Sequence, residues 1–129
     1  MERSFHFPAN VDASRLARSA LDGWVNELVG PQRGDDVRLL ATELISNVVR
    51  HGDVSEGEEI LLDVETSASS VTVIVGQPTS VEGVAMRSGE ESKEGGFGLQ
   101  LVDRLSDEWG VDHGTPGSVW FGVLRLPEG

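Results

Sequence analysis

The sequence ELISNVVRHG, residues 43–52, carries the strongest structural signal in this chain. Glu43, Asn47 and His51 recur every four residues, so on a helix they form one strip. Beside that strip, apolar residues follow the three- and four-residue spacing of a helix face: Val37, Leu40, Ala41, Leu44, Ile45 and Val48. A carboxylate and an amide in line suit a metal–phosphate site, with Asn47 as a neutral oxygen ligand and Glu43 as a base. A solvated helix edge fits the same spacing, so the strip needs support from elsewhere in the chain.

Composition limits the classes of protein that this chain can represent. Its 129 residues predict one domain, residues 1–129, with no cysteine for disulfides or thiolate metal sites. No apolar run approaches the length of a membrane span, and the N-terminus has no signal pattern, so we expect a cytoplasmic protein without membrane contact. The net charge of −12 opposes direct nucleic-acid binding. A phosphorylated ligand would have to be held by backbone amides, helix N-termini and metal.

Periodicity and turn residues predict the order β-α-α-β-β-loop-α-β-β. We expect an edge strand over Phe5–Pro8, a helix from about Asp12 to Val29 that Asn10 or Asp12 caps, and a helix from Asp35 or Asp36 to Arg50. Gly30 and Pro31 should end the first helix. The later strands are expected at residues 60–65, 71–75, 108–111 and 118–126, with a helix that opens at residues 95–98. This order favours an α+β two-layer sandwich.

Two further segments offer contacts for a phosphate group. Gly95, Gly96, Phe97 and Gly98 stand directly before a helix carrying Leu99, where free amides and the helix dipole attract anions. The motif lacks the Lys-Ser/Thr of a Walker loop and the strand of a dinucleotide fingerprint, and a hinge into a core helix is the alternative. Ser118 places a hydroxyl at the last hairpin, although a turn serine explains it as well. The histidines show no spacing typical of a zinc site.

In combination, these motifs resemble the histidine-kinase-type ATPase domains with the Bergerat fold. Residues 43–52 resemble their N box, Gly96 to Val102 their second glycine box, and Gly117-Ser118 with Leu124 to Pro127 their terminal element. The opening Phe-x-x-Pro strand and the ending around Trp109 and Trp120 are similar to the anti-sigma-factor serine/threonine kinase branch. The resemblance covers about Phe5 to Pro127.

The resemblance implies a mixed, mostly antiparallel sheet with three helices on one face, and ATP bound under a lid at about residues 77–95. It implies that Asn47 holds Mg²⁺, that Glu43 is the general base, and that the glycine loop cradles phosphates. His51, Gln77 and Ser118 would also lie at the nucleotide. Members of this branch phosphorylate an anti-anti-sigma partner of the STAS type and sequester a sigma factor, often as homodimers.

The chain departs from the family pattern at the adenine end of the site. Gln77 stands where the family carries an Asp that accepts a hydrogen bond from the adenine amino group, and Pro78 and Thr79 replace the glycines that follow it. A neutral amide accepts such a bond more weakly than a carboxylate. The Lys that often precedes the terminal Ser/Thr is also missing. The resemblance therefore leaves two functions open: an ATP-dependent protein kinase, or a regulatory module of the same fold that acts by protein–protein contacts alone.

Overall fold

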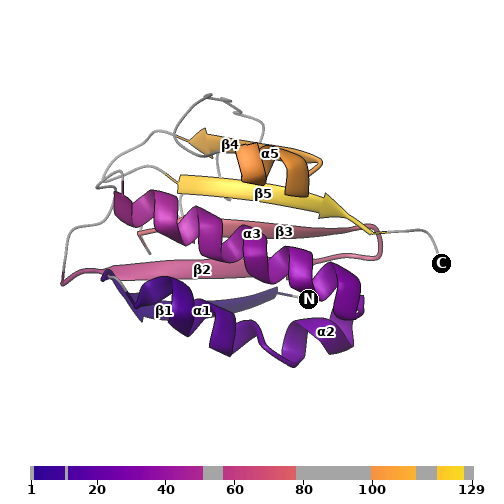
Figure 1. Ribbon diagram of the computed structural model, residues 1–129, viewed down its shortest axis with the longest axis horizontal. Helices are drawn as coiled ribbons and strands as arrows, with labels where there is room; N and C mark the ends of the chain where they lie inside the picture. Colours follow the sequence, from indigo (N-terminus) through magenta and orange to yellow (C-terminus); the bar gives the residue numbers. More distant parts are fainter. Residues whose placement is uncertain (1, 11, 51–56, 78–99, 113–118, 127–129) are drawn as a thin grey trace.

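The computed structural model describes residues 2–10, 12–50, 57–77, 100–112 and 119–126 (Figure 1). The elements are β1 (Glu2–Pro8), α1 (Ala13–Leu21), α2 (Trp24–Val29), α3 (Pro31–Arg50), β2 (Glu59–Thr66), β3 (Ser70–Gly76), α5 (Gln100–Leu105), β4 (Glu108–Asp112) and β5 (Val119–Arg125). Within these residues, none of the helices has the length and apolar character needed to span a membrane. The α+β class predicted from the sequence is confirmed.

The described strands form one five-stranded sheet in the order β1-β2-β3-β5-β4. Each neighbouring pair within it is antiparallel. β1 lies at an edge, as its Pro8 predicts, since proline cannot donate a ladder hydrogen bond. The chain passes from β3 through α5 to β4 and returns along β5, which places β5 between the two.

The helices cover one face of this sheet, and α3 crosses its middle (Figure 1). The apolar stripe predicted on α3 is fully buried. It meets the inward residues of β2 and β3, where alternate positions such as Ile60, Leu62, Val73 and Val75 face the helices. The core therefore lies between the helical layer and the sheet, and α3 is the element that fixes the position of the Glu43–Asn47 strip.

The first predicted helix is interrupted, which corrects the expectation of one helix from Asp12 to Val29. α1 ends at Leu21, and Gly23 adopts a φ of 82°, a conformation that breaks a helix and that glycine adopts at little cost. Asp12 occupies the N-cap position of α1. Among the described residues its side chain makes no capping hydrogen bond; its own amide donates to the Asn10 side chain at 2.9 Å.

The start of α3 also differs from the prediction, because the helix begins at Pro31 rather than at Asp35 or Asp36. Proline suits the first turn of a helix, where its missing N–H would have no intrahelical partner. Gly34 then lies inside the helix, where a Cβ atom would collide with Asn26 of α2. The glycine allows α2 and α3 to approach each other closely.

Candidate functional site

The Glu43–Asn47 strip lies along the C-terminal half of α3, between the sheet and the groove next to α1. Glu43 is half-buried, and Asn47 is buried with 1 % of its surface exposed. The strip is therefore not the solvated helix edge that the spacing alone allowed. His51, the third member of the predicted strip, lies outside the described residues.

Asn47 is the unusual residue of this helix. Its Nδ2 atom is buried, and among the described residues it has no hydrogen-bond partner. An unpaired buried donor costs about 1–3 kcal/mol, and buried amides in folded proteins are normally paired. Both ends of such an amide suit a nucleotide: Nδ2 can donate to a phosphate oxygen, and Oδ1 can coordinate a divalent cation. Asn47 thus fits the Mg²⁺-nucleotide role that the sequence predicted for it.

Glu43 lines a cavity of about 350 Å³ between α1 and α3. The other lining residues are Ser14, Arg15, Arg18, Thr42 and Ser46. The Ser14 hydroxyl donates to the Thr42 carbonyl at 3.3 Å and so ties the two helices together next to the cavity. The Glu43 carboxylate therefore stands among hydroxyls and guanidinium groups, at a place where a polar segment of another molecule can reach it.

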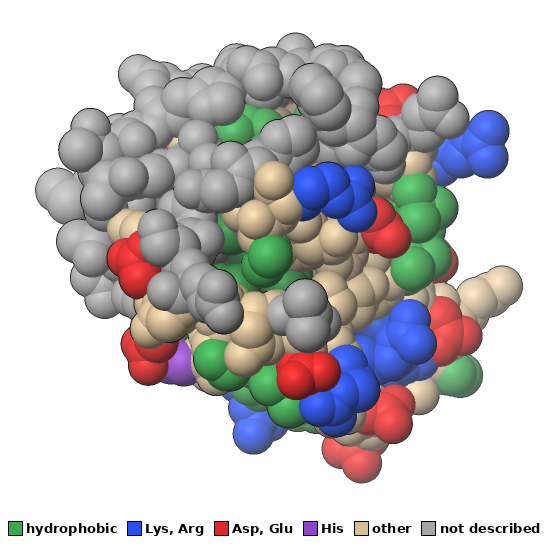
Figure 2. Space-filling model, turned by 60° about the vertical axis from the view of Figure 1, so that its left-hand side comes forward, with side chains coloured by type: hydrophobic (Ala, Val, Ile, Leu, Met, Phe, Trp, Pro, Cys, Tyr) green, Lys and Arg blue, Asp and Glu red, His purple; other side chains and the backbone are tan. Residues whose placement is uncertain are grey.

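A second cavity of about 260 Å³ continues this groove towards the end of α3. It shares Ser14 and Ser46 with the first cavity, and Asn10, Val49 and Arg50 complete its lining. Arg50 donates to the Ser46 hydroxyl at 3.0 Å. Basic and acidic side chains lie next to each other over the described part of the face shown in Figure 2. Of the groove arginines, Arg15 lies 3.7 Å from the Asp12 carboxylate.

Sequence reasoning missed the contribution of α1 to this groove. Ser14, Arg15 and Arg18 lie on one side of α1, next to the buried stripe of Ala13 and Ala17. Their helical spacing was a signal, but a polar helix side is ordinarily solvent-facing. Only the packing of α1 on α3 reveals that these side chains lie opposite Glu43.

Gln77 lies directly after β3, and its amide is engaged by another side chain. Its Nε2 atom donates to Glu58 Oε2 at 3.1 Å. The strand ends that carry the two residues are paired, because Leu61 of β2 lies opposite Gly76 of β3. Gln77 is thus half-buried at the end of the sheet where α3 also ends (Figure 1).

The remaining predicted site residues lie outside the described part of the chain. These residues are Gly95, Gly96, Phe97, Gly98, Leu99 and Ser118, together with the predicted lid beyond Gln77. Described residues flank them: α5 begins at Gln100 and β5 begins at Val119. Their predicted roles stay predictions.

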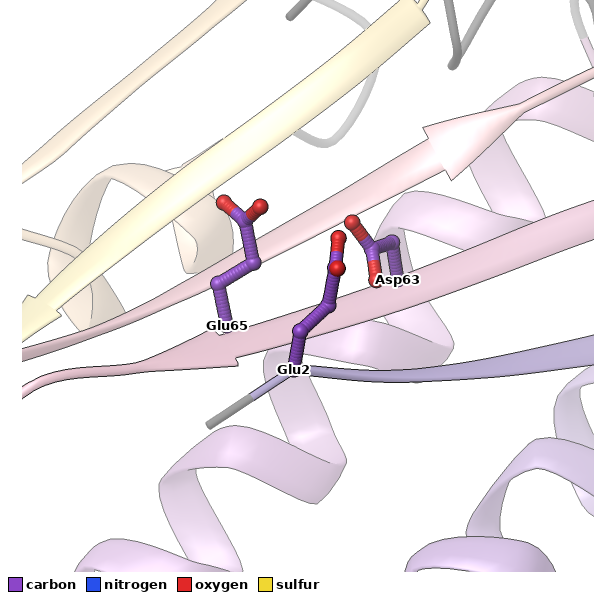
Figure 3. Close-up of side chains that lie close together, drawn as sticks. All are labelled: Glu2, Asp63 and Glu65. Atoms are coloured by element: carbon purple, nitrogen blue, oxygen red, sulfur yellow. The ribbon is translucent and has the colours of Figure 1, made fainter.

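Three carboxyl groups gather away from this site, on the face of the sheet opposite the helices (Figure 3). Carboxyl oxygens of Glu2, Asp63 and Glu65 lie within 4.8 Å of one another. Burial, with the nearby Glu2 carboxyl, raises the pKa of Asp63 to about 7, although the Ser4 hydroxyl donates to it at 3.1 Å and lowers the pKa. Burial also raises the pKa of Glu65. The sequence did not indicate this cluster, because its members come together only through the pairing of β1 with β2, which sets Glu2 opposite Glu65.

Comparison with known proteins identifies the family. The model for the histidine kinase-like ATPase domain matches residues 7–120, which is most of the chain. The chain belongs to this family. The ATPase domain also resembles a crystal structure of the RsbU and RsbW domains of Rv1364c from Mycobacterium tuberculosis, with a TM-score of 0.67 and 21 % sequence identity. The match covers 96 % of this chain and 32 % of that one, so the chain spans about a third of its length. At this identity the likeness supports the fold. No curated protein matched the sequence.

Membership of the histidine kinase-like ATPase family implies that the domain binds ATP. The buried Asn47 amide and the half-buried Glu43 carboxylate lie on α3. The Gln77 amide lies directly after β3, at the end of the sheet where α3 also ends (Figure 1).

Proposed function

We propose that this ATPase domain is a regulator of the anti-sigma type that uses Mg²⁺ and ATP to phosphorylate a serine or threonine of a STAS-type partner. In the same proposal it also sequesters a sigma factor by protein–protein contact. The observation that carries the proposal is the buried Asn47 amide, whose Nδ2 lacks a partner among the described residues. Glu43, one helical turn earlier, lies in a groove that another molecule can enter.

Asn47 and Glu43 have separate roles in this proposal. Asn47 would hold Mg²⁺ and a phosphate oxygen of the nucleotide, since its amide offers both an acceptor and a donor. Bound Mg-ATP would supply the phosphoryl group. Glu43 would accept the proton of the acceptor hydroxyl and orient that hydroxyl, which is the work of a positioned general base. The glycine loop of residues 95–98 would bind phosphate through its amides.

The groove between α1 and α3 supports a macromolecular acceptor. A free hydroxyl can reach Glu43 from the cavity that Ser14, Arg15 and Arg18 also line. Guanidinium groups and hydroxyls offer many hydrogen-bond donors to a polypeptide segment. We therefore place the serine or threonine of the partner in this groove.

Transfer of labelled γ-phosphate to STAS-type candidate proteins tests the proposal. The wild type should label one candidate, while Glu43→Gln should bind ATP with unchanged affinity and transfer at least about 100-fold more slowly, as expected when a general base is lost. Glu27→Gln is a matched control, because Glu27 lies on α2, which packs against α3 at Gly34 and does not line the groove at Glu43. Equal transfer by Glu43→Gln and the wild type would contradict the assigned role of Glu43.

A binding-only module is the second candidate, and the residue type at position 77 favours it. The resemblance places an adenine-binding Asp at this position, and the chain carries the neutral amide of Gln77 instead, which is a weaker acceptor than a carboxylate. In this alternative, the domain holds its partners through surface contacts and does not respond to nucleotide. A rise in the melting temperature when ATP is added would count against it, since a ligand that binds only the folded state stabilises that state.

A further inference from the structure

Glu58 and Gln77 lie just beyond neighbouring strand ends: Glu58 directly precedes β2, and Gln77 directly follows β3. The two strand ends are paired, because Leu61 of β2 lies opposite Gly76 of β3. The Glu58 side chain is exposed, and Gln77 is half-buried. The Glu58 carbonyl oxygen also accepts a hydrogen bond from the Ala9 amide at 2.9 Å, which anchors its backbone.

The hydrogen bond between these residues fixes the orientation of the Gln77 amide. An ionised carboxylate only accepts hydrogen bonds, so the NH₂ end of the amide must face Glu58. The observed contact, Nε2 to Oε2 at 3.1 Å, has this arrangement. The usual ambiguity between the oxygen and the nitrogen of an amide is therefore resolved by chemistry. The carbonyl oxygen Oε1 therefore faces away from Glu58 and can accept a hydrogen bond from another group.

An amide in this orientation distinguishes the two purines. Adenine carries an exocyclic amino donor at the position where guanine carries a carbonyl acceptor. A Gln77 carbonyl can accept a hydrogen bond from the adenine amino group, whereas opposite guanine two acceptors would face each other. On the basis of the proposed nucleotide site, we propose that Glu58 is a positioning residue. By fixing the orientation of the Gln77 amide, it makes this site selective for adenine nucleotides.

Glu58 also compensates for the missing family aspartate. A carboxylate that accepts from the NH₂ end polarises the amide, and hydrogen-bonded groups in a chain strengthen one another. The carbonyl of Gln77 thereby becomes a better acceptor than that of an isolated glutamine. Without Glu58, the amide can turn over and present its NH₂ end to the carbonyl of guanine.

Calorimetric titration of the whole chain with ATP and with GTP, both with Mg²⁺, tests the proposal. The wild type should prefer ATP on the order of tenfold or more, because the guanine complex sets the Gln77 carbonyl against the guanine carbonyl, with no donor between the two acceptors. Glu58→Gln removes the constraint, since a glutamine side chain can either donate or accept. Its ATP-to-GTP preference should fall to within about threefold, with ATP weakened and GTP strengthened.

Two further variants separate the loss of the fixed Gln77 amide orientation from other effects of substitution at this end of the sheet. Glu59→Gln neutralises the adjacent glutamate, which instead contacts His6 at 3.3 Å, and should keep the wild-type preference. The double variant Glu58→Gln with Gln77→Glu exchanges the two groups; its acceptor-only carboxylate at position 77 should restore the preference for ATP. An unchanged ratio in Glu58→Gln, or a wild type that binds both nucleotides equally, would overturn the proposal. A wild type that binds neither nucleotide would overturn the proposed function as well.

Discussion

Stability alone does not explain why Asn47 is buried. Its neighbours along the buried side of α3, such as Leu44 and Val48, are apolar and fully buried. A leucine in place of Asn47 would avoid leaving a donor unpaired, which costs about 1–3 kcal/mol. A polar group kept at such a cost is typical of a binding site, because local rules for stability are broken mainly where function requires it. The proposed nucleotide site therefore depends most on this side chain.

The Asp63 carboxyl should make the stability of the domain depend on pH. Its pKa rises from an ordinary 3.8 to about 7 on folding, chiefly through burial. Between these two values the folded state binds more protons than the unfolded state, so the free energy of unfolding should fall as the pH rises from about 4 to 7 and level off above that. Denaturant unfolding at a series of pH values measures this slope.

Replacing the carboxyl isolates this effect. Asp63→Asn should flatten the slope and raise the stability at pH 8, while Glu59→Gln, on the same strand but outside the cluster, should leave the slope as in the wild type. A slope of equal size in Asp63→Asn would mean that another group titrates.

At the level of elements, the contact between α2 and α3 depends on Gly34. A Cβ atom there would push on Asn26, whose Oδ1 accepts a hydrogen bond from Arg38 at 2.7 Å. Arg38 has a side chain only 12 % exposed and also pairs with Asp35, so the network has little room to shift.

Substituting this glycine tests how tightly the two helices pack. Gly34→Ala should destabilise the domain by about 1–2 kcal/mol, because overpacking outweighs the better helix propensity of alanine. Asn26→Ala combined with Gly34→Ala should recover part of the loss. Chemical denaturation measures both variants, and a more stable Gly34→Ala would refute the close approach of α2 and α3.

Element types followed from the sequence more readily than element ends. The alternation in β2 and β3 and the stripe on α3 each reflect burial of one face, which a single sequence reports directly. The break at Gly23 was missed because the apolar period continues through Trp24 and Val25, so a turn within it leaves little trace. The start of α3 was missed because Gly30 and Pro31 are typical of the end of a helix. In the structure α2 ends at Val29, and α3 begins already at Pro31.

At the scale of the whole molecule, the sequence predicted that Glu43 and Asn47 share one helix but not which residues surround them. Glu43 and Asn47 share one helix, so their spacing was sufficient to place them together. The groove opposite Glu43 depends on how α1 packs on α3, and the Glu58–Gln77 hydrogen bond depends on the register of β2 with β3. Contacts between residues far apart in the sequence follow from tertiary structure, which periodicity does not report.

The proposed function requires that the buried Asn47 amide holds a magnesium nucleotide. Calorimetric titration of Mg-ATP into the wild type and into Asn47→Ala measures this, at two temperatures so that a binding enthalpy near zero at one of them is detected at the other. We expect the wild type to bind with a dissociation constant below about 1 mM and Asn47→Ala to lose at least about tenfold in affinity. A wild type that shows no binding, or an Asn47→Ala variant that binds as tightly as the wild type, would contradict it.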